Sequence, residues 1–228
     1  MEHKRVQQIA KDTMAYAKNI IKPGMNLREL RSLCDEKMMA LGADSFWYWD
    51  VGAFVFSGDE TAVSVSGKQY TTNDRLIAPD DIITLDLSPQ CGNVWGDYAR
   101  TIILQQGVVV GLDGIENQEW KRGLNMEEFL HEELLRFARP KTTFEELYGY
   151  INGVIRDRGF VNLDFAGNLG HSIVKRKQDR VYIEKGNTMT LDEAEFFTFE
   201  PHIGIAGSKY GYKKENIYYF DNGTLAEL

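Results

Sequence analysis

The sequence predicts a layered α+β protein built from two similar halves, each with helices that cover one side of a shared sheet. Two observations lead to this prediction. Segments 22–43 and 139–160 repeat the same helix signals at a constant offset of 117 positions, which indicates an internal duplication. Strand-like apolar runs follow each of these helices, an order typical of a sheet packed against helices.

The repeat depends on five positions with structural meaning. Each copy has a proline before the helix, a capping residue, a glutamate three positions later, a leucine and a glycine that ends the helix. We therefore expect one domain over residues 1–228, with halves at about 1–113 and 114–228. The matched pairs are Pro23 and Pro140, Asn26 and Thr143, Glu29 and Glu146, Leu30 and Leu147, and Gly42 and Gly159.

The expected elements follow in order along the chain. Apolar residues at helical spacing predict a helix over the first twenty residues, which ends at Lys22-Pro23-Gly24. A second helix begins at Asn26 and ends at Gly42, and a long helix over about 116–138 joins the halves. The expected strands are 53–56, 61–66, 82–88 and 95–104 in the first half, and 161–165, 170–174, 195–200 and 215–220 in the second.

Composition and charge exclude several classes of protein. The 228 residues are 43% hydrophobic and 26% charged, as in ordinary globular proteins. The net charge of −8 argues against a nucleic-acid partner, and the basic run at 175–180 is interpreted as a solvated loop. Cys34 and Cys91 fit no disulfide framework or zinc spacing, so we expect free thiols. No apolar stretch reaches membrane-spanning length, which predicts a cytoplasmic protein without a membrane partner.

Two aspartates lie inside apolar, strand-like runs. Asp86 and Asp97 stand on either side of a turn signal around Gly92, so the segment predicts a β-hairpin. With the turn centred between Cys91 and Gly92, paired residue numbers sum to 183 and Asp86 faces Asp97. Two buried carboxylates about 5 Å apart must share a proton or bind a cation.

The second half offers a similar pair of acids. Glu200 and Glu215 end and begin strand-like runs, and a register in which numbers sum to 415 makes them face each other. His171 follows Gly170 just before a short apolar stretch. Four carboxylates and one imidazole form an oxygen-rich ligand set that favours a pair of divalent ions such as Mn²⁺, Co²⁺, Fe²⁺ or Zn²⁺.

With these motifs the chain resembles the pita-bread metallopeptidases, which include methionine aminopeptidase, aminopeptidase P, prolidase and creatinase. The shared order is Asp-(x10)-Asp, Gly-His, Phe-Glu-Pro and a last Glu near the C-terminus, and it spans nearly the whole chain. The resemblance implies a small single-domain member with a curved, mainly antiparallel sheet covered by helices on its outer face. It also implies two metal ions, with Asp86 on one, His171 and Glu200 on the other, and Asp97 and Glu215 bridging both.

The resemblance further implies hydrolysis of the N-terminal amide bond of a small peptide or dipeptide. Xaa-Pro aminopeptidase or dipeptidase activity is the leading expectation, with a metal-activated water as nucleophile and Glu200 as the proton carrier. Methionine aminopeptidase-like activity is the alternative, because the GHSI form of the His171 motif is similar to that of eukaryotic-type methionine aminopeptidases. A creatinase-like C–N hydrolase is disfavoured, since all five ligands are present here. The oligomeric state stays open, with a homodimer as one option.

The chain departs from the family pattern at two histidines that usually lie beside the metals. The region upstream of Asp86 reads SVSGKQY, and Gln178 stands seven residues after His171. These losses favour a second hypothesis, a catalytically weak or non-catalytic binding protein with the same fold. His202 lies two residues after Glu200 and on the same face of an extended strand, so it is either a catalytic hydrogen-bond donor or a structural residue.

Aromatic and polar residues near the motifs are the candidates for substrate binding. The FWYWD run either lines an apolar pocket or belongs to the core, and three candidates occupy the regions of the missing histidines. One tryptophan stands two residues before Asp97 and therefore shares its face. The expected set is Trp47, Tyr48, Lys68, Tyr70, Trp95 and Gln178.

Overall fold

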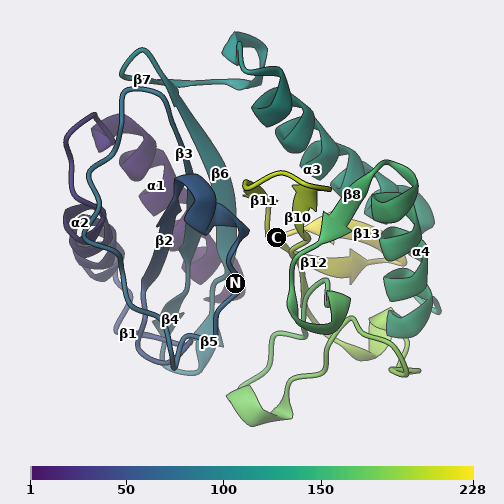
Figure 1. Ribbon diagram of the computed structural model, residues 1–228. Coiled ribbons are helices and arrows are strands. Elements are labelled where there is room, and N and C mark those ends of the chain that lie inside the picture. The colour runs from purple at the N-terminus through teal and green to yellow at the C-terminus, as the bar shows by residue number, and fades with distance from the viewer. Residues whose placement is uncertain (1) are drawn as a thin grey trace.

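The helices lie on the outside of the molecule and the strands face one another across its middle (Figure 1). The computed structural model describes residues 2–228, so Met1 lies outside the described part. In the first half, α1 (Glu2–Ile20) and α2 (Leu27–Ala40) cover a four-stranded antiparallel sheet in the order β2-β3-β6-β7. Its strands are β2 (Ala53–Ser57), β3 (Asp81–Leu87), β6 (Tyr98–Gln105) and β7 (Val108–Val110). A small sheet beside it contains β1 (Ser45–Phe46), β4 (Pro89–Cys91) and β5 (Val94–Trp95).

The second half repeats this plan with α3 (Gln118–Phe137) and α4 (Phe144–Asp157) on its outer side (Figure 1). Its strands form two three-stranded antiparallel sheets in the orders β11-β10-β8 and β13-β12-β9. They are β8 (Phe160–Asn162), β9 (Phe197–Phe199), β10 (His202–Ile205), β11 (Gly211–Lys213), β12 (Asn216–Asp221) and β13 (Thr224–Glu227). Short 3-10 turns lie at η1 (Gly58–Ala62), η2 (Leu112–Gly114), η3 (Phe165–Gly167), η4 (Lys177–Asp179) and η5 (Leu191–Glu193).

The internal repeat is visible in the geometry of the second helix of each half. Asn26 caps α2 and Thr143 caps α4, where Glu146 completes a reciprocal capping box. The first residue of each helix then donates a backbone hydrogen bond to an equivalent loop, from Leu27 to Arg75 and from Phe144 to Met189. Both helices are followed by a glycine at positive φ, Gly42 at 103° and Gly159 at 76°.

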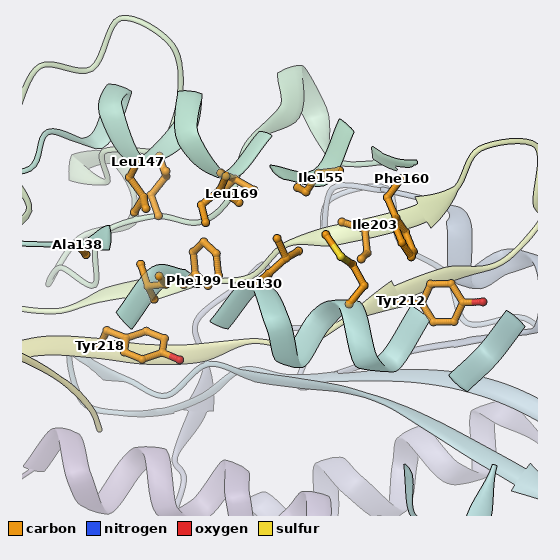
Figure 2. Packing of buried hydrophobic residues seen from close by; sticks show 14 of the residues in the cluster. Leu130, Ala138, Leu147, Ile155, Phe160, Leu169, Phe199, Ile203, Tyr212 and Tyr218 are labelled. Carbon is orange, nitrogen blue, oxygen red and sulfur yellow. The ribbon is translucent and has the colours of Figure 1, made fainter. Parts of the chain in front are cut away.

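The hydrophobic core has two main parts, and the first sheet belongs to both. Ile83, Leu85 and Leu87 of β3 pack against α1 and α2. Ile82 of the same strand packs instead into the cluster beneath α3 and α4, which includes Leu130, Phe199 and Tyr218 (Figure 2). Because side chains alternate along a strand, the face of β3 that carries Ile82 also carries Asp86, and it is directed at the second half.

The predicted register of the aspartate hairpin is wrong by two residues, because the turn is centred one position later than predicted. Asp86 faces Ala99 in the β3–β6 ladder, and Cys91 pairs with Val94 across the turn. The turn is therefore centred on Gly92 and Asn93, with Gly92 at a φ of 57° that favours glycine. Asp97 lies just before β6 and keeps the side of the ribbon that Asp86 occupies, so the pair is diagonal instead of directly opposed.

The predicted register of the glutamate pair is confirmed. Phe199 faces Asn216 in the β9–β12 ladder and His202 faces Lys213 in the β10–β11 ladder, so both ladders have pairs that sum to 415. Glu200 and Glu215 stand between these two ladders, at the point where the chain passes from one sheet to the other.

Two predicted strands are absent from the described residues. Segment 61–66 begins in the 3-10 turn η1, where the Thr61 hydroxyl donates to Gly58 O, and it continues without strand pairing. Segment 170–174 forms only isolated bridges, from His171 to Tyr182 and from Ser172 to Phe197. None of the described helices has the length and apolarity needed to cross a membrane.

Candidate metal centre

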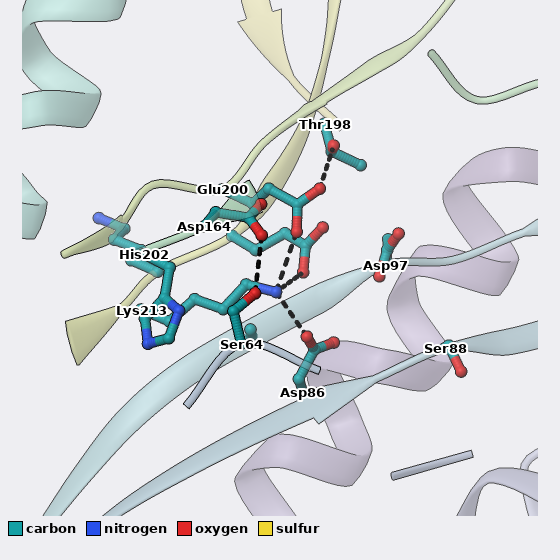
Figure 3. Close-up of polar contacts among 12 residues, drawn as sticks. Ser64, Asp86, Ser88, Asp97, Asp164, Thr198, Glu200, His202 and Lys213 are labelled. Atoms are coloured by element: carbon teal, nitrogen blue, oxygen red, sulfur yellow. Dashed lines mark hydrogen bonds and ion pairs between the residues drawn. The ribbon is translucent and has the colours of Figure 1, made fainter. Parts of the chain in front are cut away.

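A cavity of about 410 Å³ lies between the two halves, and acidic residues gather at its base. Asp86 comes from β3, Asp97 from the segment before β6, Glu200 from the end of β9 and Glu215 from the start of β12. One ligand atom each of Asp86, Asp97 and Glu215 lies within 4.8 Å of the others. The sequence-predicted acids of both halves thus meet at one place, as Figure 3 shows for Asp86, Asp97 and Glu200.

The backbone of Asp97 is fixed by a side chain that the sequence analysis did not identify. Buried Gln7 of α1 donates from Nε2 to Asp97 O over 2.7 Å and accepts from Asp97 N over 2.9 Å. This two-point contact replaces the strand pairing that Asp97 lacks and holds its carboxylate toward the cavity. A glutamine on an amphipathic helix gives no sign of such a role in the sequence.

His171 presents a free lone pair to two carboxylates. Its Nδ1 lies 3.0 Å from the carbonyl oxygen of Ser172, which can only accept, so Nδ1 carries the proton and Nε2 is unprotonated in the neutral ring. Nε2 lies 3.5 Å from Asp97 Oδ2 and 3.7 Å from Glu200 Oε1. Two ligands of a tetrahedral metal ion lie about 3.4 Å apart, so these three atoms have the spacing of a metal subsite.

Glu215 gives the clearest sign that the site requires a cation. Its side chain is fully buried, and within residues 2–228 neither carboxylate oxygen has a hydrogen-bond partner. Burial, reinforced by the charge of Asp97, raises the pKa of Glu215 well above its ordinary value. A buried carboxylate without hydrogen bonds is costly, and the Lys213 ammonium 3.7 Å from Oε2 compensates it only in part, so the residues present fit the divalent metal that the resemblance implies.

Lys213 is the main residue of the site that the sequence analysis missed. Its Nζ lies 2.6 Å from Asp86 Oδ2, 2.9 Å from Glu200 Oε2 and 3.7 Å from Glu215 Oε2 (Figure 3). Burial acts to lower the pKa of Lys213, but these three carboxylates outweigh it and raise the pKa, so the side chain is an ammonium. Lys213 stands two residues before Glu215, and this spacing along an extended chain was the available sequence signal.

The acids of the site have pKa values that differ widely. Burial raises the pKa of Asp97 to about 7. Burial acts in the same direction on Glu200, but the neighbouring charge of Lys213 is the main effect that lowers the pKa of Glu200 to about 2. Glu200 is therefore ionised over the whole working pH range, which is the form that a metal ligand or a proton acceptor requires.

Two of the six predicted substrate-binding residues line the cavity. Trp47 and Tyr48 lie on its wall, and the ring of Trp47 stacks on buried Trp95 at 4.7 Å between centroids. Trp95 thus supports the wall from behind. Trp95 was expected to bind substrate, but it does not belong to the cavity lining formed by the described residues.

The other three predicted residues lie away from the cavity wall. Tyr70 is buried in a separate aromatic cluster with its hydroxyl on the backbone of Val55. Lys68 is exposed, with its ammonium 6.0 Å from the Trp49 ring, and Gln178 is exposed in η4. In the region of the first missing histidine, Ser66 lines the cavity, whereas Lys68, Tyr70 and Gln178 do not belong to the lining formed by the described residues.

His202 lines the cavity, but its Nε2–H is already engaged. It donates to Thr61 O over 2.7 Å and so ties β10 to the η1 turn of the first half. Burial lowers the pKa of His202 to about 4, so the ring is neutral at physiological pH. These contacts favour the structural alternative for His202 over the catalytic one.

The low pKa of His202 predicts a specific pH dependence of stability. Between about pH 4 and the ordinary histidine pKa of 6.5, His202 binds fewer protons in the folded state than in the unfolded state. The free energy of unfolding therefore falls as pH falls through this window, and the contribution of His202 is fully present above it. His202→Gln, which keeps an N–H donor, should flatten the acid side of the stability curve in urea unfolding. We expect kcat within about threefold of wild type, and a loss beyond 100-fold with metal content intact would restore the catalytic role.

The basic loop at 175–180, interpreted from sequence as solvated, contributes one residue to the cavity. The guanidinium of Arg180 lies 5.0 Å from the ring of Trp47 and 5.4 Å from that of Tyr48. Lys175, Arg176 and Gln178 are exposed, as expected for a solvated loop. Other cavity residues that the sequence analysis did not identify include Phe54, Phe56, Asp164 and Tyr182.

Comparison with known proteins gives consistent matches. Residues 2–222 match the model of Metallopeptidase family M24. A curated Xaa-Pro dipeptidase of Lactobacillus helveticus is 24% identical over 133 residues, covering 58% of this chain and 33% of that protein. The chain therefore matches about a third of the length of this relative.

Solved structures match over almost the entire chain. The X-Pro aminopeptidase of Thermotoga maritima superimposes with a TM-score of 0.80 at 21% identity, covering 98% of this chain and 58% of that one. A prolidase from Pyrococcus furiosus gives a TM-score of 0.79 at 21% identity, covering 98% of this chain and 61% of that one. At this identity the likeness is one of fold.

Proposed function

Because this chain belongs to metallopeptidase family M24 and has its pita-bread fold, we propose that it is a metal-dependent exopeptidase acting on the N-terminal amide bond of short peptides. Xaa-Pro peptides and dipeptides are the substrate class we favour, since the relatives that it matches include a dipeptidase and an aminopeptidase of that type. The observation that carries the proposal is the fully buried Glu215 carboxylate, which has no hydrogen-bond partner among the described residues and lies with Asp86 and Asp97, two residues that line the cavity.

The ligand set determines which ions fit. His171, Asp97, Glu200 and Glu215 would hold a divalent ion, and their donors suit Mn²⁺, Co²⁺, Fe²⁺ or Zn²⁺. Such an ion supplies Lewis-acid polarisation of the scissile carbonyl and lowers the pKa of a bound water. The second ion that the sequence resemblance implies could bind at Asp86 only if the Lys213 ammonium moved away from its Oδ2 atom.

Glu200 is positioned to transfer the proton from the attacking water to the leaving amine. Its Oε1 accepts a hydrogen bond from Thr198 Oγ1 over 3.1 Å, and its Oε2 accepts one from Lys213. These contacts fix the carboxylate at the cavity wall, where a bound peptide would place its scissile bond.

Arg180 is the candidate for binding the free C-terminal carboxylate of a dipeptide, because it is a cation on the cavity wall held over aromatic rings. Arg180→Gln should raise KM for a dipeptide on the order of 10-fold while kcat changes little, since one charge-assisted contact is lost. A C-terminally amidated analogue should be much less affected. Arg176→Gln, an exposed arginine in the same loop, is the matched control, and equal effects on acid and amide substrates would contradict the assignment.

A non-catalytic metal-binding protein is the second candidate function. The specific observation in its favour is that Lys68 and Gln178 are exposed and lie away from the cavity wall, so the family's usual histidines have no replacement at those positions. Methionine aminopeptidase-like activity remains the alternative specificity within the enzyme proposal. The cytoplasmic location and the possible homodimer remain predictions.

A peptide panel tests the proposal. The metal-loaded protein is incubated with Met-Xaa peptides, Xaa-Pro peptides and dipeptides, beside an Asp97→Ala variant that lacks a ligand. Release of the N-terminal residue by wild type alone supports the exopeptidase, and the preferred peptide identifies its class. Stoichiometric metal without turnover of any peptide would favour the non-catalytic protein.

A further inference from the structure

The acidic cluster already contains one cation of its own. We propose that the ammonium of Lys213 takes the place of the divalent ion that Asp86 would otherwise bind, so that this protein holds one metal ion tightly instead of two. The proposal depends on the metal-binding part of the function proposed above, and it concerns the number of ions at that site.

The position of the Lys213 ammonium is that of a cation shared by ligands. It lies 2.6 Å from Asp86 Oδ2 and 2.9 Å from Glu200 Oε2, and a third carboxylate, that of Glu215, is 3.7 Å away. Figure 3 shows the lysine side chain extended among these acids, with its nitrogen between Asp86 and Glu200. An ion bound to both oxygens of Asp86 would have to displace the ammonium from Oδ2.

The backbone of Lys213 is held so that its side chain reaches the cluster. Thr101 of β6 accepts from Lys213 N through Oγ1 over 2.8 Å and donates from the same hydroxyl to Lys213 O over 3.2 Å. Lys213 also faces His202 in the β10–β11 ladder, which fixes its strand. The side chain of neighbouring Lys214 points away from the site and pairs with Glu128 of α3, so only one of the two lysines enters the site.

The remaining ligands are arranged for a single ion. The two carboxylate oxygens of Glu200 have different neighbours: Oε2 contacts Lys213 and Oε1 lies near His171 Nε2. Asp97 Oδ2 lies on the other side of Nε2 at 3.5 Å. His171, Asp97 and Glu200 therefore keep donor atoms free for one ion, whereas Asp86 is already neutralised by the lysine.

The electrostatic consequence is measurable. A divalent ion placed within a few ångströms of a buried ammonium is repelled by it, and an effective dielectric near 20 makes this penalty large. Removal of the ammonium should therefore tighten binding of a second Mn²⁺ on the order of 100-fold.

The test counts Mn²⁺ ions in the purified chain by elemental analysis and by titration calorimetry, with electron paramagnetic resonance to separate an isolated ion from a spin-coupled pair. Wild type should bind one Mn²⁺ tightly and give the spectrum of an isolated ion. Lys213→Met should bind two and give the coupled spectrum. Lys214→Met, which removes the adjacent charge directed away from the site, should behave as wild type, and Lys213→Gln replaces Lys213→Met if the latter does not fold.

Each outcome is decisive. Two tightly bound ions in wild type would overturn the proposal and leave the metallopeptidase proposal standing. One ion in wild type and also in both Lys213 variants would show that the lysine is not what excludes the second ion. Failure of wild type to bind any ion would overturn the metal-dependent function itself.

Discussion

Glu200→Gln is expected to lower kcat on Xaa-Pro peptides by about 10²–10⁴-fold at saturating metal, because the proton acceptor is lost. Glu200 is ionised in the cluster, because the neighbouring charge of Lys213 opposes the effect of burial and its pKa is lowered to about 2. Glutamine has the same shape and keeps an oxygen for the Thr198 hydroxyl, so the fold of β9 and its neighbours should persist.

Steady-state kinetics with metal content measured on the same samples checks this prediction. Glu195→Gln is the matched control, since it makes the same chemical change on the same segment at an exposed position. The control should retain wild-type kinetics. A Glu200→Gln enzyme with full metal and a kcat within about threefold of wild type would refute the role of Glu200.

Relative to wild type, Glu215→Gln should have a higher free energy of unfolding without metal and a lower one with metal. In the metal-free protein at about pH 8, it should raise the free energy of unfolding by about 1–3 kcal/mol, because a buried carboxylate without a hydrogen-bond partner is replaced by a neutral amide. With metal present, wild type gains stability from binding and the variant, which lacks a ligand, should gain far less.

The raised pKa of Glu215 determines how the stability of the metal-free protein changes with pH. The folded-state pKa of Glu215 lies well above the ordinary 4.5, so the metal-free folded state binds more protons and loses stability as pH rises above that value. The free energy of unfolding of the metal-free protein, measured with urea at several pH values, should therefore fall more steeply with rising pH for wild type than for Glu215→Gln. Destabilisation of the metal-free variant at pH 8 would contradict the account of Glu215 as a buried carboxylate without a hydrogen-bond partner.

The sequence predicted those parts of the site that depend on local pattern. Alternation of apolar residues placed Glu200 and Glu215 in the correct register, because strands on both sides of them share one ladder pattern. The helix repeat was visible because capping and stop signals are local. The partner of Asp86 was wrong by two residues, since the turn is centred one position later, on Gly92 and Asn93. A two-residue shift keeps every side chain on its face, so the alternation of the sequence does not reveal it.

The parts that sequence did not predict depend on contacts between distant segments. Gln7 holds the backbone of Asp97 across 90 residues, and no local pattern marks that glutamine. Arg180 belongs to the loop that was interpreted as solvated, and Lys213 was not singled out, but both extend long side chains into the space between the halves. Tyr70 was expected beside a substrate, but its hydroxyl satisfies the backbone of β2 instead.

The most direct test of the central claim is the metal content of the purified protein. After equilibration with Mn²⁺ or Co²⁺ and removal of free ions, wild type should retain stoichiometric metal and hydrolyse an Xaa-Pro peptide, and chelation should abolish both until metal is restored. Asp97→Ala should retain no stoichiometric metal and no activity. A wild-type protein that holds no stoichiometric metal under these conditions would contradict the account.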